Sequence, residues 1–109
     1  MKKLTIIAAL LCGTAHAEFF TGNDLLTRMN SSDTYDRTLA LGYVMGVFDA
    51  QRGADHCPPE NVTSGQIRDM VKNHLEATPA TRQFTADVQV RYVLNKAWPC
   101  PKKNNGSGV

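Results

Sequence analysis

Two cysteines constrain this chain more than any other feature, because a bond between them would tie its middle to its end. Cys57 and Cys100 have 42 residues between them. The third cysteine, Cys12, lies within the first seventeen residues, and without it the count is even, which in an oxidising compartment argues for a disulfide. Closing a loop of this length stabilises a fold by roughly 4 kcal/mol in the chain-entropy model. We therefore expect Cys57 and Cys100 to be bonded and to staple a small domain.

The first seventeen residues are typical of a bacterial secretory signal peptide. Two lysines precede an apolar run over residues 4–12, and Ala15-His16-Ala17 supplies a cleavage site. The run is shorter than the roughly 20 residues that cross a membrane as a helix. We predict that residues 1–17, with Cys12, are removed and that the mature protein is periplasmic, without membrane insertion. The alternative is an uncleaved anchor or a lipid-modified Cys12.

The mature chain is small and its charges balance. Without residues 1–17 it has 92 residues, with ten Lys and Arg against ten Asp and Glu. This length suits one hydrophobic core. A neutral chain without a basic stripe gives no reason to expect nucleic acid or an anionic membrane as a partner. We predict one domain over residues 18–101 and a flexible polar tail over residues 102–109.

Capping signals and helical periodicity predict about four helices and no sheet. A short helix follows Thr21, and a longer one spans about residues 34–53. Thr63 and Gln66 form a capping box at the start of the third helix. The fourth is expected from Pro79 to Lys96, with Phe84, Val88, Val90, Val93 and Leu94 among its apolar positions. The predicted fold is an all-α, compact array of helices stapled by one disulfide.

Small residues recur every four positions along the second predicted helix, at Gly42, Gly46 and Ala50. Glycine inside a helix is about 0.5 to 1 kcal/mol less favourable than alanine, so something is expected to pack closely on this ridge. We favour an internal helix crossing, and a self-association face is the alternative.

No catalytic constellation stands out. Nucleophilic catalysis would need an activated Ser or Cys beside a base, and the mature chain offers only His56 and His74 as histidines. The set Asp55, His56, Cys57, His74 and Cys100 lacks zinc-site spacing. A glycosidase needs two carboxylates across a cleft, and the chain has enough acids to supply them, namely Asp49, Asp55, Glu60 and Asp69. Their number is the only feature that suggests such a pair. We predict no catalytic residue, metal or cofactor.

Three motifs together resemble one family. The motifs are Gly42-Tyr43-Val44-Met45-Gly46-Val47-Phe48-Asp49, then Cys57-Pro58-Pro59-Glu60-Asn61-Val62-Thr63 with Gln66, and finally Trp98-Pro99-Cys100. Their order and spacing resemble those of the Rap/Tai immunity proteins, which inhibit type VI secretion amidases. The resemblance extends from Phe19 to Cys100. The resemblance implies a periplasmic helical protein, commonly a homodimer, which protects its producer by occluding the active site of a peptidoglycan amidase. It also implies that Cys57 and Cys100 form the family's bridge.

Contact residues do not follow from such a resemblance, because inhibitory loops diverge with their targets. We predict partner contacts at Arg52, Asp55, His56 and Glu60, which flank the bridge in a loop expected to be exposed and stiff. A second candidate loop is residues 30–36, and both loops are connectors in the alternative interpretation. An acid-stress chaperone of the small periplasmic type, with no specific toxin partner, is the competing function. A small hydrolase is a third, without supporting residues.

Overall fold

The structure is a computed structural model that describes residues 19–102. Four α-helices dominate it: α1 (Gly22–Met29), α2 (Thr34–Gln51), α3 (Ser64–Ala77) and α4 (Ala86–Ala97). The 3-10 turn η1 (Pro79–Thr81) lies between α3 and α4. The predicted all-α fold is confirmed, since the only extended pairings within residues 19–102 are two isolated bridges. The predicted signal peptide lies outside the described residues, as does the predicted tail beyond Lys102.

Two helices begin at the capping boxes that the sequence encodes. The Asp24 carboxylate accepts a hydrogen bond from the Thr21 N–H at 3.0 Å, and the Asp24 N–H donates to the Thr21 hydroxyl at 3.2 Å. Thr63 and Gln66 make the same exchange at the start of α3, at 2.9 and 3.2 Å. Both pairs satisfy backbone N–H groups that a helix leaves without partners, which fixes where α1 and α3 start.

The fourth helix starts later than predicted. Thr78 does not cap a helix there, because its hydroxyl donates to the His74 carbonyl at the end of α3 (2.7 Å). The following backbone pairs with the N-terminal segment, where the Gly22 N–H donates to the Phe84 carbonyl (2.9 Å) and the Asn23 N–H to the Arg82 carbonyl (2.9 Å). The prediction of one helix from Pro79 to Lys96 is therefore wrong: these long-range hydrogen bonds use carbonyl groups that a continuous helix would need.

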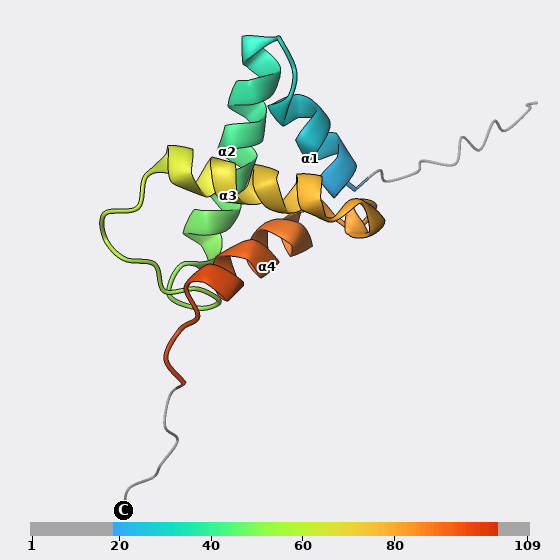
Figure 1. The fold of residues 1–109 in the computed structure, drawn as a ribbon. Helices are drawn as coiled ribbons and strands as arrows, with labels where there is room; N and C mark the ends of the chain where they lie inside the picture. The colour runs from blue at the N-terminus through green and yellow to red at the C-terminus, as the bar shows by residue number, and fades with distance from the viewer. Residues whose placement is uncertain (1–18, 103–109) are drawn as a thin grey trace, which may run out of the picture.

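The four helices enclose one core, and each packs against the other three. In Figure 1, α3 runs across α2, α4 lies beside α3, and the connection from α2 to α3 comes back next to the end of α4. The core residues lie on the inner stripe of each helix and include Leu25, Val44, Ile67, Val71, Leu75, Val90 and Leu94. Burying such side chains is the main stabilising contribution to a domain of this size.

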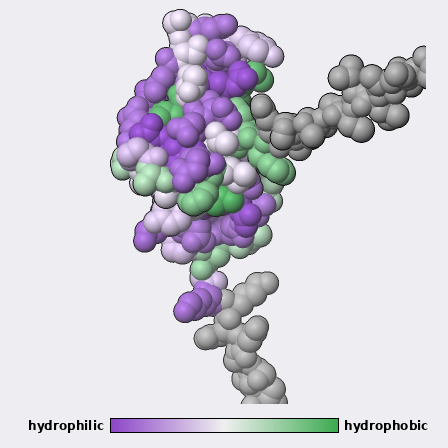
Figure 2. All heavy atoms as spheres, turned by 90° about the vertical axis from the view of Figure 1, so that its right-hand side faces the viewer, coloured by the Kyte–Doolittle hydropathy of each residue, from purple (hydrophilic) through white to green (hydrophobic). Residues whose placement is uncertain are grey.

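Figure 2 shows a side of the molecule on which hydrophilic residues dominate and apolar residues reach the surface in separate areas. The exposed large apolar side chains belong to the start of the described chain, to α2 and to the segment that includes α4, namely Phe19, Tyr35, Leu39, Phe84, Val88 and Tyr92. Exposed apolar side chains that gather on one face are typical of interaction sites.

Candidate functional site

A tight turn follows α2 and leads to the first cysteine. Gly53 has a φ of +84°, a conformation that glycine adopts without strain. Its N–H donates to the His56 carbonyl at 2.8 Å, and the Asp55 N–H donates to the Gln51 carbonyl at 2.9 Å. We call residues 52–57 the tethered loop. Internal hydrogen bonds give this loop a defined shape before any partner arrives.

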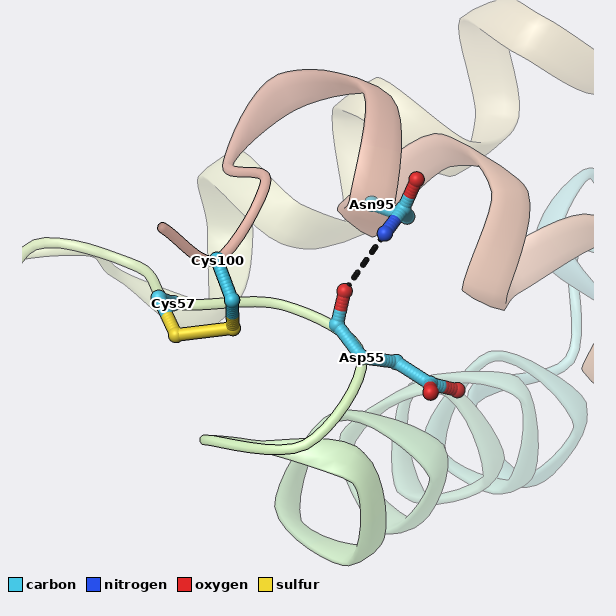
Figure 3. The surroundings of a disulfide bond; sticks show 4 residues. All are labelled: Asp55, Cys57, Asn95 and Cys100. Carbon is cyan, nitrogen blue, oxygen red and sulfur yellow. Dashed lines mark hydrogen bonds between the residues drawn. A yellow bond between two sulfur atoms is a disulfide. The ribbon is translucent and has the colours of Figure 1, made fainter. Parts of the chain in front are cut away.

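The tethered loop is also attached to α4 and the segment after it. Cys57 is bonded to Cys100, with Cα atoms 4.8 Å apart, as the sequence predicted. The Cys57 N–H donates to the Trp98 carbonyl (2.8 Å), and the Asn95 side-chain amide donates to the Asp55 carbonyl (2.6 Å). Figure 3 shows how the disulfide and the Asn95 hydrogen bond hold the loop at two points. These links join parts of the chain about 40 residues apart, so the loop cannot move freely from the domain.

Three of the four predicted contact residues have side chains that reach the surface. Arg52 is exposed, with its guanidinium carbon 6.0 Å from the centre of the Phe48 ring. Glu60 is exposed in the connection that continues toward α3. Asp55 is half-buried and forms an ion pair of 2.7 Å with Arg91 of α4. The loop therefore presents a cation and a carboxylate on a restrained backbone.

The expectation that His56 is exposed is wrong. Its side chain is 0% exposed, and its ring packs against Phe48 with the ring centres 4.9 Å apart. Burial is the main influence that lowers the pKa of His56, while the Asp55 carboxylate acts in the opposite direction. Apolar packing by Phe48 draws this histidine inward, so its side chain takes no part in the outer surface of the loop.

An apolar face formed by α4 and the segment just before it adjoins the tethered loop, and no prediction from the sequence included it. Phe84, Val88 and Tyr92 follow one another every four residues and are between 51% and 54% exposed. A shallow hollow of about 330 Å³ lies over this stripe, and another of about 390 Å³ runs from Val88 and Tyr92 to Asp55 and Arg91. We call Phe84, Val88 and Tyr92 the α4 stripe.

The sequence places Phe84 and Val88 among the apolar positions of the fourth predicted helix, and helical spacing alone does not say which of these positions are buried. In the structure the buried positions of α4 are Ala86, Gln89, Val90, Val93 and Leu94. Gln89 is held there by hydrogen bonds to His74 (3.1 Å) and to the Thr81 carbonyl (2.5 Å). A polar residue thus lies on the inner face of α4, whereas Val88 lies on the outer face and Phe84 lies just before the helix begins.

The second candidate loop, residues 30–36, is also held in place. Asp36 accepts hydrogen bonds from Arg28 (2.8 Å) and from the Ser31 hydroxyl (2.9 Å). The Ser31 carbonyl accepts from Arg37 at 2.8 Å. These contacts all link the loop to the helices on its two sides. It is a restrained connection between α1 and α2, and its role in binding stays a prediction.

The small-residue ridge of α2 faces outward, so the favoured prediction of an internal helix crossing is wrong. Gly42, Gly46 and Ala50 are exposed, and a Cβ atom added at either glycine would meet nothing within 4 Å. The helix buries the neighbouring stripe of Ala40, Val44 and Phe48 instead. Beside the ridge lies an apolar groove of about 480 Å³, lined by Phe20, Arg28, Tyr35, Thr38, Leu39, Gly42 and Tyr43. The alternative, a self-association face, therefore stays open.

Two further structural properties bear on function. Within residues 19–102, no three His, Cys, Asp or Glu side chains converge closely enough to hold a metal ion. None of the helices in the same part of the chain is both long and apolar enough to cross a lipid bilayer. The exposed features of this part of the structure are the tethered loop, the α4 stripe and the α2 ridge.

Comparison with known proteins gives one result that covers most of the chain. A comparison with curated proteins finds no match. The family model of the Rap1a immunity proteins matches residues 21–100, which includes all four helices and both bonded cysteines. The resemblance inferred from the three sequence motifs is thereby confirmed, and this chain belongs to the Rap1a immunity protein family.

Proposed function

We propose that this protein acts in the periplasm as an immunity protein, which binds a peptidoglycan amidase delivered by type VI secretion and blocks access to its active site. The observation that carries the proposal is the family match over residues 21–100. Inhibition by occlusion needs a complementary and rigid surface and no catalytic group. The tethered loop supplies a restrained backbone and the α4 stripe an exposed apolar area, which supports the proposal.

The tethered loop suits entry into an enzyme cleft because it is already ordered. Association is opposed by the entropy of ordering flexible segments, and a restrained loop reduces that loss. The disulfide, the Asn95 hydrogen bond and the Arg91 ion pair all restrain it from the same side, that of α4. Arg52 of the loop and Glu60, three residues beyond it, supply exposed charges of opposite sign, which favour one orientation of the partner.

The α4 stripe would extend the contact beyond the loop. A stable interface buries about 800 Å² on each partner, which exceeds what one short loop presents. Val88 and Tyr92 line the same hollow as Asp55, so the apolar stripe continues directly from the loop. A central apolar area with charges at its border is the usual composition of protein interfaces.

Action in the periplasm is supported by the disulfide and by the sequence of residues 1–17. Bonds such as that between Cys57 and Cys100 persist in oxidising compartments and are rare in the cytosol. The predicted signal peptide provides the route of export. A periplasmic inhibitor also meets a wall-degrading enzyme in the compartment where that enzyme acts.

We include a homodimer in the proposal, formed by α2 of two copies packed antiparallel. The first half of its outer face carries bulky side chains, with Tyr35 67% and Leu39 42% exposed. The second half carries Gly46 and Ala50, which leave the backbone almost bare. An antiparallel pair places the bulky half of each helix against the bare half of the other, as a two-fold interface requires.

We expect an amidase to be encoded beside this protein, and the immunity role is tested with that enzyme. Purified mature protein should form a stoichiometric complex with it and stop its cleavage of isolated peptidoglycan, measured by chromatography of the released muropeptides. Arg52→Glu and Val88→Arg should each raise the Kd at least about tenfold, because one reverses a loop charge and the other places a charge in the apolar stripe.

Arg68→Glu is the matched control, because it reverses an exposed charge on α3, away from the loop and the stripe. It should leave the Kd unchanged. If the purified protein neither binds nor inhibits the amidase, the immunity proposal is wrong. Equal effects of Arg52→Glu and Arg68→Glu would instead reject the tethered loop as the contact site.

The dimer is tested separately by sedimentation equilibrium. The mature chain should sediment with twice its monomer mass, and Gly46→Arg should convert it to a monomer because the large side chain keeps the helices apart. Asn73→Arg adds the same side chain at an exposed position of α3 and should leave the dimer intact. A wild-type monomer at all concentrations would remove the dimer from the proposal and leave the immunity role standing.

A further inference from the structure

The tethered loop has an unusual interior residue, His56. Its side chain is 0% exposed, and neither ring nitrogen has a hydrogen-bond partner within residues 19–102. A neutral imidazole carries one donor and one acceptor, and leaving them unpaired in the interior is unfavourable. An apolar ring would fill the same space without that disadvantage. What histidine offers here and an apolar ring does not is a charge that changes near neutral pH.

The groups around His56 come from two helices and from the loop itself. Phe48 of α2 covers the ring, and its carbonyl group favours the charged form without completing a hydrogen bond of ordinary geometry. Within the loop, Asp55 favours the charged form and Arg52 opposes it. The Asp55 carboxylate is already paired with Arg91 of α4, at 2.7 Å. The carboxylate that favours a proton on the buried ring is therefore already paired with another cation.

A local opening of the loop breaks noncovalent contacts alone, among them the ion pair of Asp55 with Arg91 and the hydrogen bond from Asn95 to the Asp55 carbonyl. The His56 carbonyl accepts one hydrogen bond, from Gly53, whose φ of +84° allows a hinge at that residue. On the other side, Cys57 is held covalently by Cys100 and by the hydrogen bond to Trp98. An outward movement of His56 would therefore be confined between Gly53 and Cys57. The helices and the disulfide would stay in place.

We propose that residues 52–56 form an acid-responsive segment, which opens when His56 takes up a proton and its ring leaves the interior. One consequence rests on the proposed immunity function: acid would loosen the segment that carries Arg52 and Asp55 and so weaken the complex with the amidase. The opening itself needs no partner.

The direction of the response follows from the protonation equilibrium. Burial lowers the pKa of His56 in the closed loop, whereas the exposed ring of the open loop has an ordinary pKa near 6.5. The closed loop keeps its full stability relative to the open loop above pH 6.5. It loses that stability as the pH falls below 6.5 toward the lower pKa of His56 in the closed loop. One proton is taken up on opening, so the open population rises up to about tenfold per pH unit in this window.

The test is amide hydrogen exchange of the mature chain at pH 7.5, 6.5 and 5.5, corrected for the intrinsic rates. Protection of the Gly53 and Asp55 amides, which donate to the His56 and Gln51 carbonyls, should fall by no more than about twofold between pH 7.5 and 6.5 and by up to about fivefold between pH 6.5 and 5.5. The amides of Val71 and Leu75 in α3 should not change, because the helices stay closed. His56→Phe should abolish the loss, whereas His74→Gln, which replaces the other histidine of residues 19–102, should retain it.

Unchanged protection in the wild type, or the same loss in His56→Phe, would overturn the proposal. If His56→Phe does not fold, the ring of wild-type His56 is titrated by NMR instead. An apparent pKa below 6.5 with resonances of the open loop supports the proposal, and a value at or above 6.5 rejects it. A loop that opens in acid in a protein that binds no amidase would reject the immunity role while the acid response stands.

Discussion

Asp55 and Arg91 meet across 36 positions of sequence, where one carboxylate oxygen accepts a hydrogen bond from Nε of the guanidinium at 2.7 Å and lies 2.7 Å from Nη2 in an ion pair. The Asp55 carbonyl also accepts from the Asn95 side chain. One residue therefore fastens the tethered loop to α4 through its side chain and its backbone. Both partners in α4 lie one turn apart, which makes the helix a rigid support for the loop.

Arg91→Ala should loosen the loop while changing global stability little. The ion pair is partly exposed, and such pairs contribute about 0.2 to 1 kcal/mol to the free energy of unfolding. Hydrogen exchange of the Cys57 amide should nevertheless become faster, since a restraint on the loop is lost. Arg68→Ala is the control, because its partner Asp69 is the next residue and fastens nothing. Equal exchange of Cys57 in both variants would show that Arg91 is not a restraint.

Removing the disulfide should lower the free energy of unfolding by about 2 to 5 kcal/mol, as is typical of small secreted domains. The bond joins Cys57 to Cys100 and so closes a loop that contains α3 and α4. Urea unfolding of the double variant Cys57→Ser and Cys100→Ser measures the loss. Reductant should lower the wild-type midpoint to that of the double variant and leave the variant unaffected. A wild-type midpoint that ignores reductant would contradict a bonded pair.

The capping box of α1 should make part of the stability acid-sensitive. Hydrogen bonds from the Thr21 backbone, and next from its hydroxyl, lower the pKa of Asp24 from the ordinary 3.8. The stabilisation is therefore present above that value and is lost as the pH falls through the lower pKa of the folded state. Asp24→Asn should remove this acid-sensitive part, at roughly 0.5 to 1 kcal/mol in neutral solution.

Urea unfolding at pH 7 and pH 3 measures the effect, with the capping box of α3 as an internal comparison. There the side chain of Gln66 takes the place of the carboxylate. Gln66→Ala should lower stability by the same amount at both pH values, because an amide does not titrate. If Asp24→Asn also lowered stability equally at both, the carboxylate of Asp24 would have no special role in the cap.

The sequence predicts best those features that depend on neighbours within one turn. Thr21 with Asp24 and Thr63 with Gln66 both cap helices in the structure, because a capping box needs only residues three positions apart. Thr78 and Pro79 carry a similar signal, yet Thr78 bonds backward to α3 and the next segment pairs with residues 20–23. Local spacing does not reveal that competition, since the pairing partner lies about 60 residues away.

The candidate site was predictable in position and less so in orientation. The two cysteines indicated where the chain is stapled, and the tethered loop lies there. Whether His56 points inward depends on the ring of Phe48, eight residues earlier. Likewise, apolar residues follow one another at helical spacing on both the buried and the exposed face of α4. The pattern therefore did not separate the core residues from the outer stripe of Phe84, Val88 and Tyr92. The ridge of α2 shows the same limit, because small residues indicate a close approach but not its partner.

Two glycine substitutions should have opposite effects on stability. A Cβ atom on Gly22 would lie 2.9 Å from the Arg82 carbonyl oxygen and 3.0 Å from Cδ2 of Leu75. That carbonyl is backbone and already accepts from Asn23, so it cannot move without separating α1 from the segment before α4. Gly22→Ala should therefore lower the free energy of unfolding by about 1 to 3 kcal/mol.

Gly46→Ala should instead raise it by about 0.5 to 1 kcal/mol, because the position is inside a helix and an added Cβ meets nothing within 4 Å. Urea unfolding at a concentration where the chain is monomeric isolates these effects from association. At higher concentration, Gly46→Ala should weaken the proposed dimer, since the added methyl group separates the two α2 backbones. A variant that is less stable as a monomer would mean that the α2 ridge is covered within one chain, against the outward orientation on which the dimer depends.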